Sequence, residues 1–350
     1  MHTDIRTLDV NLERFFGTKP TRVDDAFAIS LAEQSYLPKV DDPRADWVVV
    51  AAFNAFQAFQ QGQLGKVERF ATIGTGSGTD VVAALETFPQ LKFAAMTDLH
   101  QSVVDVAKHN VVSATQGSAP VVRRVAERIF AADGDLLQPL EGQAAFDLIY
   151  ENLPNIPLST SSSTTDTLVR EGQTSSTFVG DRSADGVPAH VSAAMLDLHY
   201  LCLRQARVKQ LVNPKTGVIL SSIGGRVPVQ AMLDMARAAG YTARVVSLAW
   251  KVQSEPHTVI GEYAESQKSG LGTYYFYPTS ALASVFNHLS PATAALHSDW
   301  IEQQLLPHRL DAVTAYRQHC EGIEIGHTVV VIASVFGVVG EDGDTVRSIL

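Results

Sequence analysis

Three glycines and two aspartates in the first half of the chain have the types and spacing of a nucleotide-binding site. Gly74, Gly76 and Gly78 follow an apolar strand and open a helix, where glycine lets the backbone approach a ligand closely and the helix N–H groups stay free to donate. Asp98 ends the next apolar strand, where a carboxylate can accept hydrogen bonds from both hydroxyls of a ribose. Asp135 precedes a further strand, where it can accept from an adenine amino group or simply cap a turn.

The glycine spacing argues against a dinucleotide. That fingerprint needs a glycine at position 79, where Thr79 stands. A fourth feature is the loop Asn152-Leu153-Pro154-Asn155, which follows the apolar strand FDLIY. Ligands of open α/β sheets bind at the carboxyl ends of the strands, and all four features fall at such ends. Their coincidence favours a functional site over a purely structural pattern.

Apolar strands alternate with amphipathic helices from Phe70 onward. This rhythm predicts an α/β fold, a doubly wound Rossmann-like sheet with right-handed crossovers. Residues 1–65 are expected to form a helical cap, because Trp47, Val50 and Phe53 recur at roughly helical spacing. Residues 66–350 are expected to form the main domain, with further helices and strands added at its C-terminal end.

Composition excludes several kinds of partner. The net charge of −10, without a cluster of Lys and Arg, would repel a phosphate backbone, so nucleic acid is not an expected partner. The two cysteines and eleven histidines show no metal-ligand spacing, and no metal is predicted. The N-terminus lacks a signal-peptide pattern, and the most apolar run, Thr328 to Gly340, is too short to cross a membrane. A cytoplasmic protein is expected, and its oligomeric state, possible homo-oligomers included, stays open.

In their order along the chain, these features resemble the class I S-adenosylmethionine-dependent methyltransferases: a glycine loop, an acid after the second strand, an acid before the fourth strand, then the reaction-centre loop. The resemblance covers about Phe70 to Tyr277 and implies S-adenosyl-L-methionine as the cofactor and 66–350 as the catalytic domain. The family usually has an acid two residues before the first glycine, and Thr72 stands there instead. The implied cofactor contacts are Gly74, Thr75, Gly76, Gly78, Asp98, Leu99, Asp135, Leu136 and Asn152.

The segment from Gly217 onward, with a Gly-Gly-Arg turn and the later YYFYP run, resembles the methyltransferase region of methionine S-methyltransferases. This resemblance implies transfer to the thioether sulfur of free L-methionine, giving S-methylmethionine, and a place in sulfur metabolism. A thioether has no proton to lose, so the reaction needs no general base, and no pair of residues in the predicted loops indicates a base dyad. Catalysis would depend chiefly on orientation and on excluding water.

Several residues are expected to serve the acceptor. Arg226 is the first choice as partner of the acceptor carboxylate, because guanidinium offers bidentate geometry. Tyr150, Glu151 and Asn152 are expected to surround the transferring methyl group as the catalytic residues. The expected substrate-binding residues are Asn152, Asn155, Arg226 and Tyr200, whereas His199, next to Tyr200, is more commonly a satisfied core residue.

Two other functions stay open. Glutamine and adenine methyltransferases carry Asn-Pro-Pro-Tyr in the reaction-centre loop, and Asn155 replaces the aromatic platform here, which lowers but does not remove a protein glutamine N5-methyltransferase reading. A non-catalytic, cofactor-binding regulatory protein is the second alternative, which Thr72 permits. The polar segment Leu158 to Val187 is interpreted either as a flexible lid over the ligands or as a solvated insertion.

Overall fold

The computed structural model describes residues 6–32, 49–156 and 185–336, and its centre is a mostly parallel sheet. Its parallel strands lie in the order β5 (Phe130–Asp133), β4 (Phe93–Asp98), β3 (Arg69–Ile73), β6 (Leu148–Glu151) and β7 (Val218–Gly225). The chain enters at β3, moves outward through β4 and β5, and then crosses back to β6 and β7. The strand order therefore reverses between β3 and β6, which is where open α/β sheets bind ligands.

The final strand, whose pairing the sequence left open, runs antiparallel through the sheet. β11 (Ile325–Phe336) pairs with β7 on one side and with β8 (Tyr241–Val252) on the other. Two short strands, β9 (Tyr275–Pro278) and β10 (Leu310–Asp311), continue the sheet from the beginning of β11. The doubly wound α/β prediction is confirmed, with an antiparallel addition at the C-terminal side.

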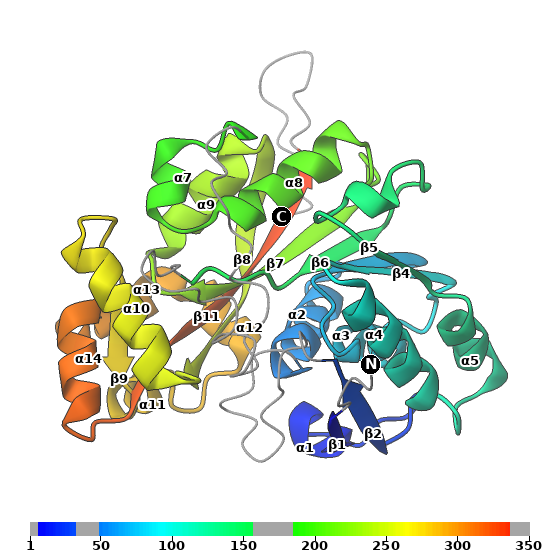
Figure 1. Ribbon diagram of the computed structural model, residues 1–350, viewed down its shortest axis with the longest axis horizontal. Coiled ribbons are helices and arrows are strands. Elements are labelled where there is room, and N and C mark those ends of the chain that lie inside the picture. The colour runs from blue at the N-terminus through cyan, green and yellow to red at the C-terminus, as the bar shows by residue number, and fades with distance from the viewer. Residues whose placement is uncertain (1–5, 33–48, 157–184, 337–350) are drawn as a thin grey trace.

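Helices cover both faces of the sheet, as Figure 1 shows. One face carries α2 (Val49–Gln61), α3 (Thr79–Thr87), α4 (Gln101–Ser113) and α5 (Pro120–Glu127). The other carries α7 (Ala189–Ala193), α8 (Asp197–Val208) and α9 (Val229–Ala238), with the single turn η1 (Gln138–Leu140) beside them. Because both faces are buried, the central strands read as nearly continuous apolar runs.

The C-terminal additions gather around β9 and β10, at the left of Figure 1. They are α10 (Pro256–Lys268), α11 (Thr279–Phe286), α12 (Pro291–Leu296), α13 (Ser298–Leu305), η4 (Leu306–His308) and α14 (Ala312–Cys320). None of the helices in the described ranges is long and apolar enough to cross a membrane.

The prediction of an all-helical N-terminal cap is wrong for part of its length. β1 (Arg6–Asn11) and β2 (Ala26–Leu31) form an antiparallel pair, with only the short helix α1 (Leu12–Phe16) between them. Phe27, Ile29 and Leu31 are buried while the residues between them are not, and this alternation is the period of a strand, not of a helix. The predicted helix around Phe53 and Phe56 is confirmed as α2.

One buried amide joins this N-terminal pair of strands to the glycine loop. Asn110, on α4, accepts from the backbone N–H of Ser30 at 2.8 Å. Its Nδ2 donates to the carbonyls of Ser30 at 2.8 Å and of Ser77 at 3.0 Å. Because Asn110 is fully buried, its amide cannot reach water, and these bonds satisfy its polar atoms instead.

Candidate active site

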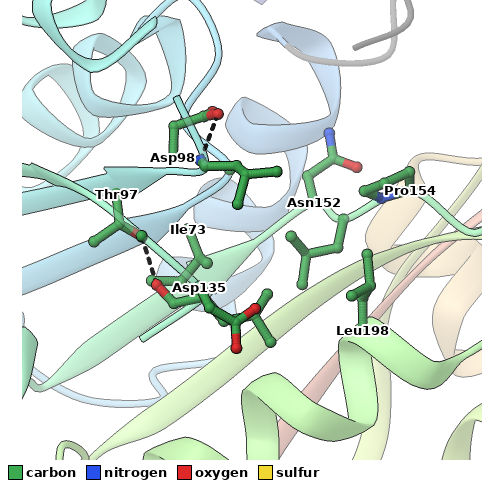
Figure 2. Close-up of a pocket in the computed structure, with 12 residues that line it drawn as sticks. Ile73, Thr97, Asp98, Asp135, Asn152, Pro154 and Leu198 are labelled. Atoms are coloured by element: carbon green, nitrogen blue, oxygen red, sulfur yellow. Dashed lines mark hydrogen bonds between the residues drawn. The ribbon is translucent and has the colours of Figure 1, made fainter. Parts of the chain in front are cut away.

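A pocket opens at the carboxyl ends of β3, β4 and β6, at the point where the strand order reverses (Figure 2). It holds about 510 Å³ of empty space, the open solvent at its mouth included. Its walls come from four loops and the start of α8. The lining residues are Ile73, Gly74, Thr97, Asp98, Leu99, Gly134, Asp135, Leu136, Asn152, Leu153, Pro154 and Leu198.

Asp98 stands at the edge of this pocket with each carboxylate oxygen already oriented. Oδ2 accepts from the backbone N–H of Gly76 at 3.0 Å, and Oδ1 accepts from that of Leu99 at 2.8 Å. Burial raises the pKa of Asp98 above its ordinary value, while these two N–H donors act in the opposite direction. Each oxygen keeps a lone pair for a ligand hydroxyl.

Glycine is required at two positions of the loop, because other atoms lie close to the backbone there. Gly74 lines the pocket at φ +68°, and a Cβ there would come within 3.2 Å of Leu153 Cδ2 across the opening. Gly78 caps α3 at φ +80°, where a Cβ would lie 2.7 Å from the carbonyl oxygen of Ala107 on α4. Gly74 therefore keeps the pocket open, whereas Gly78 packs two helices together and lies outside the pocket lining.

The loop that carries Asp135 is held in place by α8. Gln205 donates to Asp135 Oδ2 at 3.2 Å and accepts from the N–H of Leu137 at 2.9 Å. Leu136, between them, adopts the left-handed region at φ +52°, and its carbonyl accepts from Thr97 Oγ1 at 2.9 Å, a bond drawn in Figure 2. A non-glycine residue in this region marks backbone strain, which clusters at ligand sites.

A buried carboxylate lies beneath the glycine loop, where the sequence placed none. Asp80, in the first turn of α3, accepts from the hydroxyls of Thr72 and, at 3.0 Å, of Thr75. All three side chains are buried, and burial raises the pKa of Asp80 to about 6. Thr72, at the position where the family resemblance implies an acid, is therefore hydrogen-bonded to a carboxylate from the following helix.

Glu151, the last residue of β6, lies at ion-pair distance from a histidine, a contact that the sequence did not reveal. Both of its oxygens lie near Nδ1 of His199 on α8, at 2.9 and 2.7 Å, and both side chains are fully buried. His199 is a core residue, as expected, but its Nε2 has no hydrogen-bond partner among the described residues. The pair lies on β6 and α8, outside the loops in which the sequence shows no base dyad.

Arg226 follows β7 at the same edge of the sheet and is buried among neutral groups. Its guanidinium donates to Asn155 Oδ1 at 3.2 Å, to Gln253 Oε1 at 2.8 Å and to His327 Nε2 at 3.0 Å, and it lies 5.2 Å from the centre of the Tyr263 ring. Burial, and then the charge of Arg226, lower the pKa of His327 well below its ordinary value. Within the described ranges no carboxylate forms an ion pair with Arg226.

Asn155 ties this cationic group to the reaction-centre loop. Its Nδ2 donates to the carbonyl of Gly224 at 2.9 Å, and its own carbonyl accepts from the hydroxyl of Tyr263. Pro154, one residue earlier, lines the pocket. Arg226 consequently lies one side chain behind the pocket wall.

Of the residues predicted for catalysis and for the acceptor, Asn152 lines the pocket, whereas Tyr150, Glu151, Asn155, Tyr200 and Arg226 do not. Tyr150 points to the opposite face of the sheet, where its ring meets Phe56 of α2 edge-on at 5.1 Å. Tyr200 lies on α8 in the core beneath the sheet and is absent from the pocket lining. The chain neighbours of Tyr150 and Tyr200 are Glu151 and His199, and these two side chains point toward each other. A shift of one residue along a strand or a helix turns the side chain in a different direction.

The structure brings together most of the predicted cofactor residues and adds others. Gly74, Asp98, Leu99, Asp135, Leu136 and Asn152 line one pocket, Gly76 binds Asp98, and Thr75 binds Asp80. Thr97, Gly134 and Leu198 were missed, since nothing in their local sequence marks them. The proposed lid, Leu158 to Val187, lies almost wholly outside the described residues. In the described part of the chain no group of three His, Cys, Asp or Glu side chains could hold a metal ion.

Comparisons with known proteins give weak similarities. No family model matches the sequence, and no curated protein matches it. Among solved structures, YcgJ from Bacillus subtilis is 12% identical with a TM-score of 0.40, over 81% of this chain and 97% of that one. The [4+2]-cyclase SpnF is 12% identical with a TM-score of 0.39, over 93% and 92% of the two chains. A precorrin-6y C5,15-methyltransferase from Geobacter metallireducens is 10% identical with a TM-score of 0.34, over 82% and 88%.

Proposed function

We propose that this protein is an S-adenosylmethionine-dependent methyltransferase whose acceptor is a small carboxylate-bearing molecule, namely free L-methionine methylated at its thioether sulfur to give S-methylmethionine. The observation that carries the proposal is the pocket at the reversal of strand order, with Asp98 and Asp135 at the ends of neighbouring strands and the Asn152–Pro154 loop opposite them. A cytoplasmic location and a role in sulfur metabolism stay predictions.

The pocket residues fit this cofactor. The oriented oxygens of Asp98 suit two ribose hydroxyls, and Asp135 beside Leu136 suits an adenine ring with its amino group. The space kept open by Gly74 would be filled by any larger side chain, as expected where a ligand passes close to the backbone. When bound, S-adenosylmethionine supplies an electrophilic methyl group on a sulfonium.

Arg226 supports a carboxylate on the acceptor. Among the described residues this buried guanidinium is surrounded by neutral acceptors and has no counter-ion of the kind that buried charges normally have. An acceptor carboxylate that displaced some of these neutral partners would provide one. Asn155 is engaged with Gly224 and Arg226, so it serves this cationic group and offers no flat surface for a planar base or amide.

The activity test uses purified protein, methyl-labelled S-adenosylmethionine and free L-methionine, with the product identified by mass spectrometry. Labelled S-methylmethionine is the expected result. If the cofactor binds by calorimetry but no label enters methionine, methionine is the wrong acceptor. If the cofactor does not bind at all, the methyltransferase proposal itself is refuted, and a protein glutamine N5-methyltransferase is excluded with it.

Arg226→Ala should raise the KM for methionine by about 30-fold or more, because removing one partner of a buried charge pair costs about 2–5 kcal/mol. Arg309→Ala is the matched control, since Arg309 is exposed and stacks 4.0 Å from the Tyr275 ring away from the pocket. Methionine methyl ester, which lacks the carboxylate, should be a poor acceptor for the wild type and no worse for Arg226→Ala. An unchanged KM in a folded Arg226→Ala protein would remove Arg226 from the site.

A further inference from the structure

The Glu151–His199 pair has the geometry of an oriented proton acceptor. Both carboxylate oxygens of Glu151 lie within 2.9 Å of His199 Nδ1. This contact favours the tautomer of a neutral ring that carries its hydrogen on Nδ1, in which Nε2 has the free lone pair. A carboxylate that holds one ring nitrogen fixes the tautomer and the orientation of the imidazole. The pair is thus built to present Nε2 as an acceptor.

Several buried polar atoms lack partners within residues 6–32, 49–156 and 185–336. Among them are His199 Nε2 and, on the same side of the sheet, the hydroxyl of Ser221 on β7. Ser221 pairs with Glu151 in the parallel register of β6 and β7, and it shares a face with Ile219 and Ile223, which belong to the core under α8. Buried polar atoms without a partner are rare and call for an explanation.

Three residues next to the Glu151–His199 pair line the proposed cofactor pocket. Ile73, which pairs with Glu151 across β3 and β6, lines the pocket. Asn152 follows Glu151 in the chain, Leu198 precedes His199, and both line the pocket too. In Figure 2 the side chain of Leu198 points from α8 toward the loop that carries Asn152 and Pro154. His199 and Glu151 themselves lie behind these lining residues and are not part of the lining.

The charge of Glu151 acts on the neighbouring thiol. Burial, followed by the negative charges of Glu151 and Asp135, raises the pKa of Cys202 well above its ordinary value. Cys202 therefore stays a neutral thiol and does not compete for the methyl group.

We propose that His199, oriented by Glu151, is a general base for a second acceptor class at this site: the amine nitrogen of a small carboxylate-bearing molecule such as an α-amino acid. The proposal rests on the methyl-transfer activity proposed above, but not on methionine as its acceptor. Arg226 would bind the carboxylate in both cases. A thioether gives His199 nothing to accept, whereas an amine gives it a proton.

The transfer step balances. The amine lone pair forms the new N–C bond as the C–S bond of the cofactor breaks, and that electron pair stays on the sulfur. The N–H proton passes to His199 Nε2, giving an imidazolium that the Glu151 carboxylate stabilises. The proton then leaves to water with product release, and the site returns to its starting form.

The test measures which atom of the acceptor is methylated. Wild-type protein is incubated with labelled cofactor and either L-methionine or glycine, and mass spectrometry separates N-methylated from S-methylated products. We expect N-methylated product from both amino acids, with glycine as the acceptor that lacks sulfur. S-methylmethionine alone, or no methylated amino acid, would overturn the proposal. N-methylated product without S-methylmethionine would support it and refute methionine sulfur as the acceptor.

Variants then assign the base. His199→Gln should lower kcat for the amine by about 10²- to 10⁴-fold, with a much smaller change in KM, and should lower the ratio of N- to S-methylated product. Glu151→Gln, which still holds the ring but without the charge, should lower kcat by about 10-fold or more. His190→Gln, on the exposed surface of α7, is the matched control. Undiminished N-methylation in His199→Gln would overturn the proposal; if that variant does not fold, the wild-type products and Glu151→Gln decide.

Discussion

Replacing Asp98 by asparagine should weaken cofactor binding by about 30- to 1,000-fold. In the wild type the two carboxylate oxygens accept from Gly76 at 3.0 Å and from Leu99 at 2.8 Å, and each retains a lone pair for a ribose hydroxyl. Asparagine keeps one oxygen and puts an NH₂ group in place of the other. That NH₂ faces a backbone N–H, so one loop bond is lost together with one ribose bond.

The magnitude follows from these bonds. A hydrogen bond to a charged group contributes about 1.5–3 kcal/mol, and a donor left unsatisfied adds about 1–3 kcal/mol. The loop N–H is left unsatisfied in the free protein as well as in the complex. Only part of its cost of about 1–3 kcal/mol therefore weakens binding of the cofactor. The difference in binding free energy is then about 2–4 kcal/mol, at 1.4 kcal/mol for each factor of ten.

Isothermal titration calorimetry with S-adenosylhomocysteine, a stable product analogue, measures this difference. Asp133→Asn is the matched control, because Asp133 pairs with Asp98 in the sheet register but is exposed and lies outside the pocket lining. It should bind as the wild type does. An affinity within about threefold of the wild type in a folded Asp98→Asn protein, less than 1 kcal/mol, would refute the placement of the ribose at Asp98.

Two further predictions concern stability. Gly78→Ala should lower the free energy of unfolding in urea by about 2–4 kcal/mol, because it adds a Cβ at φ +80° and 2.7 Å from the carbonyl of Ala107. Gly76→Ala, at φ +54° with open space around it, should lose only about 1–2 kcal/mol; equal losses would contradict the packing argument. The pKa of Asp80 is raised from 3.8 to about 6, so the folded protein keeps this proton after the unfolded chain has released it, and stability falls as pH rises from about 4 to 6. Relative to Asp80→Asn, which has no such proton, the wild type should lose about 2 kcal/mol between pH 4 and pH 7 in urea titrations, and a pH-independent difference would contradict this.

The parts of the site that lie close together in sequence could be predicted. The glycine loop, Asp98 and the Asn152–Asn155 loop each follow an apolar strand, and parallel strands bring their carboxyl ends to one edge. Periodicity therefore specifies both the strands and the edge at which their loops meet. The same reasoning overlooked the alternation of Phe27, Ile29 and Leu31, because a strong helical pattern further along dominated the N-terminal region.

The contacts that depend on docking could not be predicted. Glu151 and His199 are 48 residues apart, and they meet only because α8 packs across the end of β6. Asp80 reads as an ordinary first-turn acid until α3 is placed over Thr72. Tyr150 illustrates the opposite case, because a shift of one residue along a strand turns a side chain to the other face.

The bonds of Asn110 have a consequence for the whole N-terminal region. A single amide spans from Ser30 in β2 to the carbonyl of Ser77 in the glycine loop. The order of β2 and the order of this loop are therefore thermodynamically linked, and the linkage is reciprocal. A chain without β1 and β2 would leave the buried amide of Asn110 without its two bonds to Ser30, next to the glycine loop. The folding of these strands therefore contributes to the order of the loop at the proposed site.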